Sequence, residues 1–234
     1  RRKRATLTSC RVVALYCESP MPLQNRVSPS GDIQAVDARG TMMGNRGIIH
    51  DYRTRELLSR RWQHQAWICC VLEFKDFQHP IMGKSRYTEL FFLDEATALS
   101  AGHRPCAYCR RSDFNAFKRH WVTANRPGHT LNSVKAPDID RQLHRERTTR
   151  NRLKVTFESK LAALPLGTVI LNAGSQQLVH GQCVLEWNAD GYRKAEPIAA
   201  EQLVTVLSPR SIVAAMSAGY RPAIHASAVA CLVE

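Results

Sequence analysis

The sequence predicts an α+β protein, in which a small α/β module is followed by a basic helical connector and a small β-rich C-terminal unit. Two observations predict this class. In the first half of the chain, apolar runs of strand length alternate with amphipathic stretches of helical period. After Pro165, short apolar runs separated by glycines take over. The 234 residues are enough for one large domain or two small ones with a buried core.

A strong excess of positive charge runs through the chain. Lysine and arginine total 33 against 20 acidic residues, which gives a net charge of +13 and a pI of about 9.8. Such a balance favours polyanionic partners, with phosphate first among them. No apolar run approaches the ~18 residues of a membrane helix, so we expect no membrane partner and a bacterial, cytoplasmic setting. The eight cysteines are then expected to be reduced or bound to metal.

The N-terminal segment, residues 1–40, is predicted to form a flexible basic arm. Prolines and glycines interrupt it, and no periodicity persists. The chain opens on Arg1 rather than Met, and Met21 begins a stretch of more ordinary composition. We therefore expect residues 1–20 to be dispensable or not native.

Residues 41–128 are predicted to form the α/β module. Residues 51–62 have a helical pattern, because their apolar side chains fall roughly on one face and their arginines on the rest. Residues 66–74 and 87–93 are apolar runs of strand length, separated by a polar turn. The first part of the module is therefore expected to contain a helix and two strands.

Two further helices are predicted on either side of a pair of central cysteines. Asp94 is a suitable N-cap for the first helix, and Gly102 is placed to end it as the C′ residue. The second helix is expected over residues 112–124. Its buried face is formed by Phe114, Phe117 and Trp121.

The connector is predicted to span residues 129–160, with a basic helix over residues 139–161. Between positions 141 and 154 the chain carries six basic residues against one acidic residue, Glu146. Such a helix can contact several phosphates, so nucleic acid is the expected partner; an ordinary solvated helix is the alternative. The predicted nucleic-acid-binding residues are Arg110, Arg111, Arg141, Arg145, Arg147, Arg150, Arg152 and Lys154.

The C-terminal unit, residues 161–234, is predicted to be a small β meander or partial barrel closed by a helix. Its expected strands lie at residues 168–171, 177–179 and 184–187, with glycines between and around them. The closing helix is expected to have Ser208 as its N-cap and Pro209 at its first position, and to end at Gly219.

The central cysteines form the most specific motif, Cys106-x-x-Cys109. Two thiolates in one tight turn can reach the same ion and supply half of a tetrahedral zinc site. Arg104, Arg110 and Arg111 surround the pair, and positive neighbours lower the pKa of a thiol and so favour metal binding. A redox dithiol and two ordinary cysteines are the alternatives. The pair follows a helix stop instead of joining a strand to a helix, which favours zinc.

Residues 92–110 contain the run Gly102-x-Arg104-Pro105-Cys106-x-x-Cys109. This segment resembles the second half of the Ada-type zinc-binding domain. The resemblance implies zinc held by four cysteines and, in the Ada repair proteins, an upstream cysteine that accepts a methyl group from a DNA phosphotriester. It places DNA ahead of RNA as the expected partner. Residues 43–92 are also similar to uncharacterised bacterial proteins, which implies no function.

The upstream cysteines depart from the Ada pattern. That pattern supplies Cys-x-x-x-Cys, whereas Cys69 and Cys70 are adjacent here. Adjacent residues on a strand point to opposite faces, so only one of the two is expected to be a ligand. We expect Cys70 and His50 to complete the site, with Asp51 beside the histidine. The alternatives that stay open are Cys69, His64, His103 and His120.

No catalytic motif stands out in the sequence, which lacks HExxH, Gly-x-Ser-x-Gly, Walker A and Rossmann patterns. The first hypothesis is therefore a zinc-stabilised nucleic-acid-binding protein, in DNA repair or modification. The second is a metal-scaffolded enzyme, such as a nuclease or another hydrolase acting on nucleic acid, whose catalytic residues are unknown. The third is a zinc-stapled adaptor between proteins.

Overall fold

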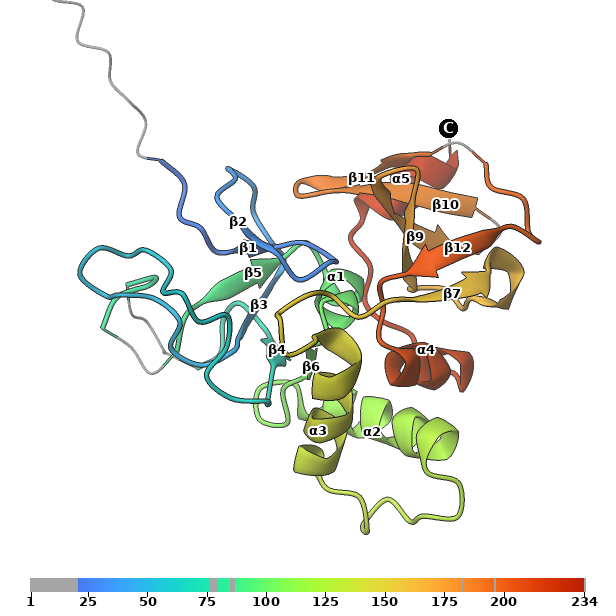
Figure 1. Cartoon of the computed structure of the whole chain (residues 1–234), viewed down its shortest axis with the longest axis horizontal. Coiled ribbons are helices and arrows are strands. Elements are labelled where there is room, and N and C mark those ends of the chain that lie inside the picture. The colour runs from blue at the N-terminus through green and yellow to red at the C-terminus, as the bar shows by residue number, and fades with distance from the viewer. Residues whose placement is uncertain (1–20, 76–79, 85–86, 182, 196, 234) are drawn as a thin grey trace, which may run out of the picture.

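The computed structural model describes residues 21–75, 80–84, 87–181, 183–195 and 197–233. Over these residues the chain has two six-stranded sheets and five α-helices, which confirms the predicted α+β class. The two sheets lie side by side with a short helix between them, and three helices are grouped along one edge (Figure 1). The predicted dispensable segment, 1–20, lies outside the described residues.

The strands of the first sheet are short. They are β1 (Arg26–Val27), β2 (Ile33–Gln34), β3 (Met42–Asn45), β4 (Ile68–Cys70), β5 (Leu90–Phe92) and β6 (Arg104–Pro105). Their order is β2-β1-β5-β3-β4-β6. β1 runs parallel to β5 and β4 parallel to β6, while the other neighbours are antiparallel. Both predicted strands of this region are present, as the shorter β4 and β5.

The first two strands correct the prediction of a flexible arm for residues 21–40, the part of this segment that the structure describes. Arg26 pairs with Phe91, and Val27 is buried in the core of the first sheet. A strand of two residues has no periodicity, and its partner here is remote in the sequence. The prolines and glycines of this region therefore mark turns between short strands.

The helix predicted over residues 51–62 is also wrong. This segment forms turns and one isolated β-bridge between His50 and Leu57. The Asp51 carboxylate accepts hydrogen bonds from the backbone N–H groups of Arg53 and Thr54, at 2.7 and 3.4 Å. This side chain closes a turn and competes with a helix for the same backbone groups.

The two helices beside the central cysteines are confirmed. α1 (Glu95–Ser100) has Asp94 as its N-cap, whose carboxylate accepts from the backbone N–H of Thr97 at 2.8 Å. Gly102, with a φ of 88°, follows its last turn. α2 (Arg111–Asn125) buries the predicted aromatic face of Phe114, Phe117 and Trp121.

The basic helix α3 (Ala136–Arg147) is shorter than the predicted 139–161. It ends because Thr148 is extended and bridges to Lys154, with a turn at Arg152, whose φ is 64°. Ile139 and Leu143 pack into one core with α2 and with α4 (Arg210–Ser217). The predicted connector is thus part of a core that it shares with both of its neighbours.

The second sheet is antiparallel throughout. Its strands are β7 (Phe157–Lys160), β8 (Val169–Asn172), β9 (Ser175–His180), β10 (Cys183–Asn188), β11 (Gly191–Lys194) and β12 (Leu203–Val206), in the order β11-β10-β9-β8-β12-β7. β8, β9 and β10 are the three predicted strands. A 3-10 turn, η1 (Leu161–Ala163), follows β7, and α5 (Ser227–Val233) lies near the end of the chain.

The start of α4 differs from the prediction by one residue. Pro209 is the N-cap and the helix begins at Arg210. The Ser208 hydroxyl accepts the backbone N–H of Val169 at 3.0 Å and so serves the second sheet instead of the helix. Gly219, with a φ of 112°, follows the end of α4 as predicted.

Asp94, the N-cap of α1, and Glu95, in its first turn, link this helix to the C-terminal part of the molecule. The Asp94 carboxylate accepts from the Tyr192 hydroxyl and from the His225 backbone N–H, each at 2.9 Å. The Glu95 carboxylate accepts from the Tyr220 hydroxyl at 2.6 Å. All of these groups belong to or follow the second sheet, so α1 is fixed between the two sheets and orients the turn that follows it.

Candidate metal centre and basic surfaces

Three thiols meet where β4 ends and where the chain turns after β6. The two strands are parallel, with Cys69 opposite Pro105, so the next pair in this register is Cys70 and Cys106. The Cys106 N–H donates to the Cys69 carbonyl at 2.9 Å. The Sγ atoms of Cys70, Cys106 and Cys109 all lie within 4.8 Å of one another, a group that can hold a metal ion.

The three thiols form hydrogen bonds with one another. The pKa of Cys106 is lowered, because the thiols of Cys109 and Cys70 donate hydrogen bonds to it. The Tyr108 backbone N–H adds a further contact to the Cys106 sulfur at 3.4 Å. The pKa of Cys70 is raised by its hydrogen bonds to the sulfurs of Cys106 and Cys109 and by burial. Hydrogen bonds thus join the three thiols into one cluster of sulfur donors, a set that suits a soft cation.

Cys69 lies on the other face of β4. Its side chain is fully buried, and its sulfur accepts a hydrogen bond from the Arg110 guanidinium at 3.6 Å. Burial raises the pKa of this thiol. The alternation of a strand therefore brings Cys70, and not Cys69, to the Cys106-x-x-Cys109 turn.

His50 is buried but does not join the thiol cluster. Its Nε2 lies 2.9 Å from the Gly83 carbonyl, which can only accept, so Nε2 carries the proton. Its Nδ1 then accepts from the Thr88 hydroxyl at 2.6 Å. Both ring nitrogens are thereby engaged with the protein. Within the part of the chain that the structure describes, the alternatives His64, His103 and His120 are likewise absent from the group.

The predicted nucleic-acid-binding residues divide into buried and exposed ones. Arg110 is 6% exposed and pairs with Glu95 at 2.9 Å and with Asp113 at 2.8 Å, so it serves the fold. Arg147 is 2% exposed, and Lys154 is partly buried. The remaining five are exposed, namely Arg111, Arg141, Arg145, Arg150 and Arg152.

The burial of Arg147 follows from its phase on α3. Ile139, Leu143 and Arg147 are spaced by four residues and lie on one helical face, the face that enters the core. The Arg147 guanidinium donates to the Gly102 carbonyl at 2.8 Å and to the Gln65 carbonyl at 2.7 Å. This spacing was visible in the sequence and could have identified Arg147 as a buried cation.

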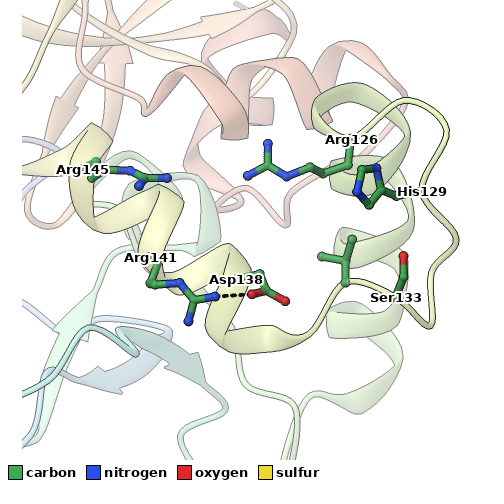
Figure 2. A pocket seen from close by; sticks show the side chains of 7 residues that line it. Arg126, His129, Ser133, Asp138, Arg141 and Arg145 are labelled. Atoms are coloured by element: carbon green, nitrogen blue, oxygen red, sulfur yellow. Dashed lines mark hydrogen bonds and ion pairs between the residues drawn. The ribbon is translucent and has the colours of Figure 1, made fainter.

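The exposed arginines of α3 line a basic groove, which we call the α3 groove. It is a cavity of about 300 Å³ between the end of α2, the following loop and α3. It is lined by Arg126, His129, Ser133, Val134, Asp138, Arg141 and Arg145. Figure 2 shows the guanidinium groups of Arg126, Arg141 and Arg145 around it, with Asp138 paired to Arg141.

Hydrogen bonds hold two of these arginines in place. Arg126 and Arg145 both donate to the Gln142 amide oxygen, at 3.1 and 3.2 Å. Asp138, the single carboxylate among the lining residues, also accepts the Lys135 backbone N–H at 2.7 Å and so caps α3. The groove therefore carries three guanidinium groups against one carboxylate. Arg126 was not among the predicted binding residues, because it is remote in the sequence from the basic run of α3.

The comparison with known proteins gives no match to a family model, to a curated protein or to a solved structure. None of the helices in the described ranges is long and apolar enough to cross a membrane.

Proposed function

We propose that this chain is a zinc-stabilised protein that binds nucleic acid, DNA in preference to RNA, through the α3 groove and the exposed arginines around it. The observation that carries this proposal is the set of three guanidinium groups, from Arg126, Arg141 and Arg145, around one concave surface. Guanidinium groups match the geometry of phosphate oxygens, and a groove with several of them follows a phosphate backbone.

The choice of zinc rests on the donor set. Thiolates favour zinc and other soft ions over magnesium and calcium. In a tetrahedral site with Zn–S bonds of about 2.3 Å, the sulfur atoms lie about 3.8 Å apart. The three sulfurs, all within 4.8 Å of one another, can reach that arrangement with small movements. Cys70, Cys106 and Cys109 would supply three ligands, and the fourth would come from another group.

The metal supports the basic groove through the fold. It would tie the end of β4 to the turn that leads directly into α2. Since α2 and α3 share one core, the position of α2 determines the position of the groove. The resemblance of residues 92–110 to the Ada-type domain supports a role in DNA repair or modification.

The test is the salt dependence of binding to a labelled DNA duplex, measured by fluorescence anisotropy. The double variant Arg141→Ala/Arg145→Ala is expected to reduce the slope of log K against log[salt] by about 1.8, because each lost phosphate contact removes about 0.9. The matched control is Lys160→Ala/Arg193→Ala, which removes two exposed cations from the second sheet.

Equal slopes for the two double variants, or no salt-dependent binding by the zinc-loaded wild type, would refute the proposal. An RNA duplex of the same sequence, bound as tightly as DNA, would refute the preference for DNA. Zinc content is measured in the same preparations by elemental analysis, with one ion per chain expected.

A further inference from the structure

A second basic cavity lies at the other end of α3. Its volume is about 210 Å³, and we call it the Trp67 cavity. It is bordered by the loop between β1 and β2 and by the chain that follows α3. The residues that line it are Ser30, Gly31, Asp32, Ile33, Arg46, Arg61, Trp62, Trp67, Ala101, Arg147, Thr148, Arg152 and Lys154. Five of them are cations, and Asp32 is the single carboxylate.

Two of the cations are buried against the same aromatic ring. The guanidinium carbons of Arg46 and Arg147 lie 4.0 and 3.9 Å from the Trp67 ring centroid, and both residues are 2% exposed. Arg46 donates through Nη2 to the Gly31 carbonyl at 3.0 Å and through Nε to His103 at 3.3 Å. The Nε atom of Arg147 is buried and has no hydrogen-bond partner within the part of the chain that the structure describes.

Two further cations contact backbone carbonyls at the cavity. Lys154 donates to the carbonyls of Ser100 and Pro29, and Arg152 donates to the Ser59 carbonyl at 2.6 Å. Carbonyl groups satisfy these donors but do not neutralise their charge. Within the described ranges, none of the five cations forms an ion pair with a carboxylate.

This arrangement contrasts with the buried arginines elsewhere in the same structure. The Arg104 guanidinium forms two contacts with the Asp140 carboxylate, at 2.8 and 2.9 Å, and Arg110 pairs with Glu95. Buried charges without a counterion are costly and need one. The effect is visible at Lys154, whose pKa is lowered to about 7 by burial and by the nearby charges of Arg46 and Arg147.

We propose that the Trp67 cavity binds a phosphate monoester as the counterion of this cationic cluster. Its ligands would be the guanidinium groups of Arg46 and Arg147 and the amine of Lys154, with Arg61 and Arg152 at its border. A cavity of about 210 Å³ is smaller than the range of about 300–1,000 Å³ that holds a drug-sized ligand, so it suits one phosphate group and a small attached unit.

Two sources offer this chemistry. One is the terminal phosphate of a nucleic acid strand, and binding of this group rests on the proposed function. The other is a free phosphorylated small molecule, whose binding does not depend on the proposed function. Trp62 is half-buried beside the cavity and can stack on a base in either case. The phosphate chemistry is common to both, and the experiment separates the sources.

The test uses the full chain and begins with inorganic phosphate, titrated by isothermal calorimetry at constant ionic strength. Saturable binding is expected for the wild type. Arg61→Ala, which changes an exposed residue of the lining, and Lys154→Met should each weaken binding, the latter about tenfold because it removes a charge-assisted hydrogen bond. The matched control is Arg60→Ala, an exposed neighbour that does not line the cavity and is expected to bind phosphate as the wild type does.

Folding of each variant is checked by circular dichroism, and Arg61→Ala keeps the test valid if Lys154→Met fails to fold. Absence of saturable phosphate binding by the folded wild type, or equal weakening by Arg60→Ala and Arg61→Ala, overturns the proposal. A second titration compares a 5′-phosphorylated oligonucleotide, its 5′-hydroxyl counterpart and a nucleoside monophosphate. Tighter binding of the phosphorylated strand identifies the first source. Binding of the monophosphate and of neither strand supports the cavity and refutes the nucleic-acid function.

Discussion

Cys69 and Cys70 are neighbours on one strand and allow a matched test of the metal centre. We predict that Cys70→Ser lowers the metal content of the purified protein and that Cys69→Ser leaves it unchanged. The reason is geometric: the Cys70 sulfur lies within 4.8 Å of those of Cys106 and Cys109, whereas Cys69 faces Arg110.

The expected size of the effect follows from ligand linkage. A metal at about one hundred times its dissociation constant stabilises the folded state by about 2.7 kcal/mol. In a chain of this length, 1 kcal/mol corresponds to about 2–4 °C in Tm, so loss of the metal should lower Tm by about 5–11 °C. Cys69→Ser is destabilising too, by about 1–3 kcal/mol, because it puts a hydroxyl into a fully buried site.

Because the two losses of stability overlap, Tm alone does not distinguish the variants. The assay is therefore thermal unfolding with and without a chelator, together with elemental analysis. The Tm of the wild type and of Cys69→Ser should fall on chelation, and the Tm of Cys70→Ser should not respond. A Cys69→Ser protein that loses its metal, or a Cys70→Ser protein that keeps it and still responds to chelator, would refute the assignment.

Two further predictions concern buried charge. Asp140→Asn should lower the free energy of unfolding by about 3–5 kcal/mol in urea, because it leaves the Arg104 guanidinium buried without its partner. The control Asp190→Asn, at an exposed ion pair, should cause no measurable loss of stability. Similar losses of stability in both variants would contradict this prediction. For Lys154, the pKa is lowered in the folded state to about 7 from an ordinary 10.5, so between these values the unfolded chain binds more protons and stability should rise with pH. Urea unfolding at pH 7 and pH 9.5 should show a smaller rise in Lys154→Met than in the wild type, and an identical rise would show that the amine is not buried as a cation.

Local signals in the sequence predicted the two helices beside the metal centre, but not β6, which directly precedes the Cys-x-x-Cys turn. The pair therefore joins a strand to a helix, contrary to the prediction that it only follows a helix stop. Asp94 and Gly102 act through neighbouring backbone groups, so the limits of α1 could be predicted without knowledge of the fold. The aromatic face of α2 followed from its helical period. Strand alternation predicted that only one of Cys69 and Cys70 reaches the Cys-x-x-Cys turn, and the structure identifies it as Cys70.

Dependence on distant partners explains part of what the sequence did not reveal. β1 is a two-residue strand whose existence depends on β5. The charge count on α3 did not reveal which basic residues face the core, although the spacing from Leu143 to Arg147 held that information. The Trp67 cavity could not be predicted at all, because Arg46 and Lys154 meet there only after the first sheet and α3 have packed together.

The Cys-x-x-Cys turn occupies a central position between these basic features. Arg104 precedes it by two residues and binds Asp140 of α3, and Arg110 follows it directly and binds Glu95 of α1. The turn thus fixes, through two buried ion pairs, both the helix that carries the α3 groove and the helix that joins the sheets. The opposite end of α3 contributes Arg147 to the Trp67 cavity. A metal bound by the turn would therefore act on both basic sites through the placement of α3, with no need to contact a ligand itself.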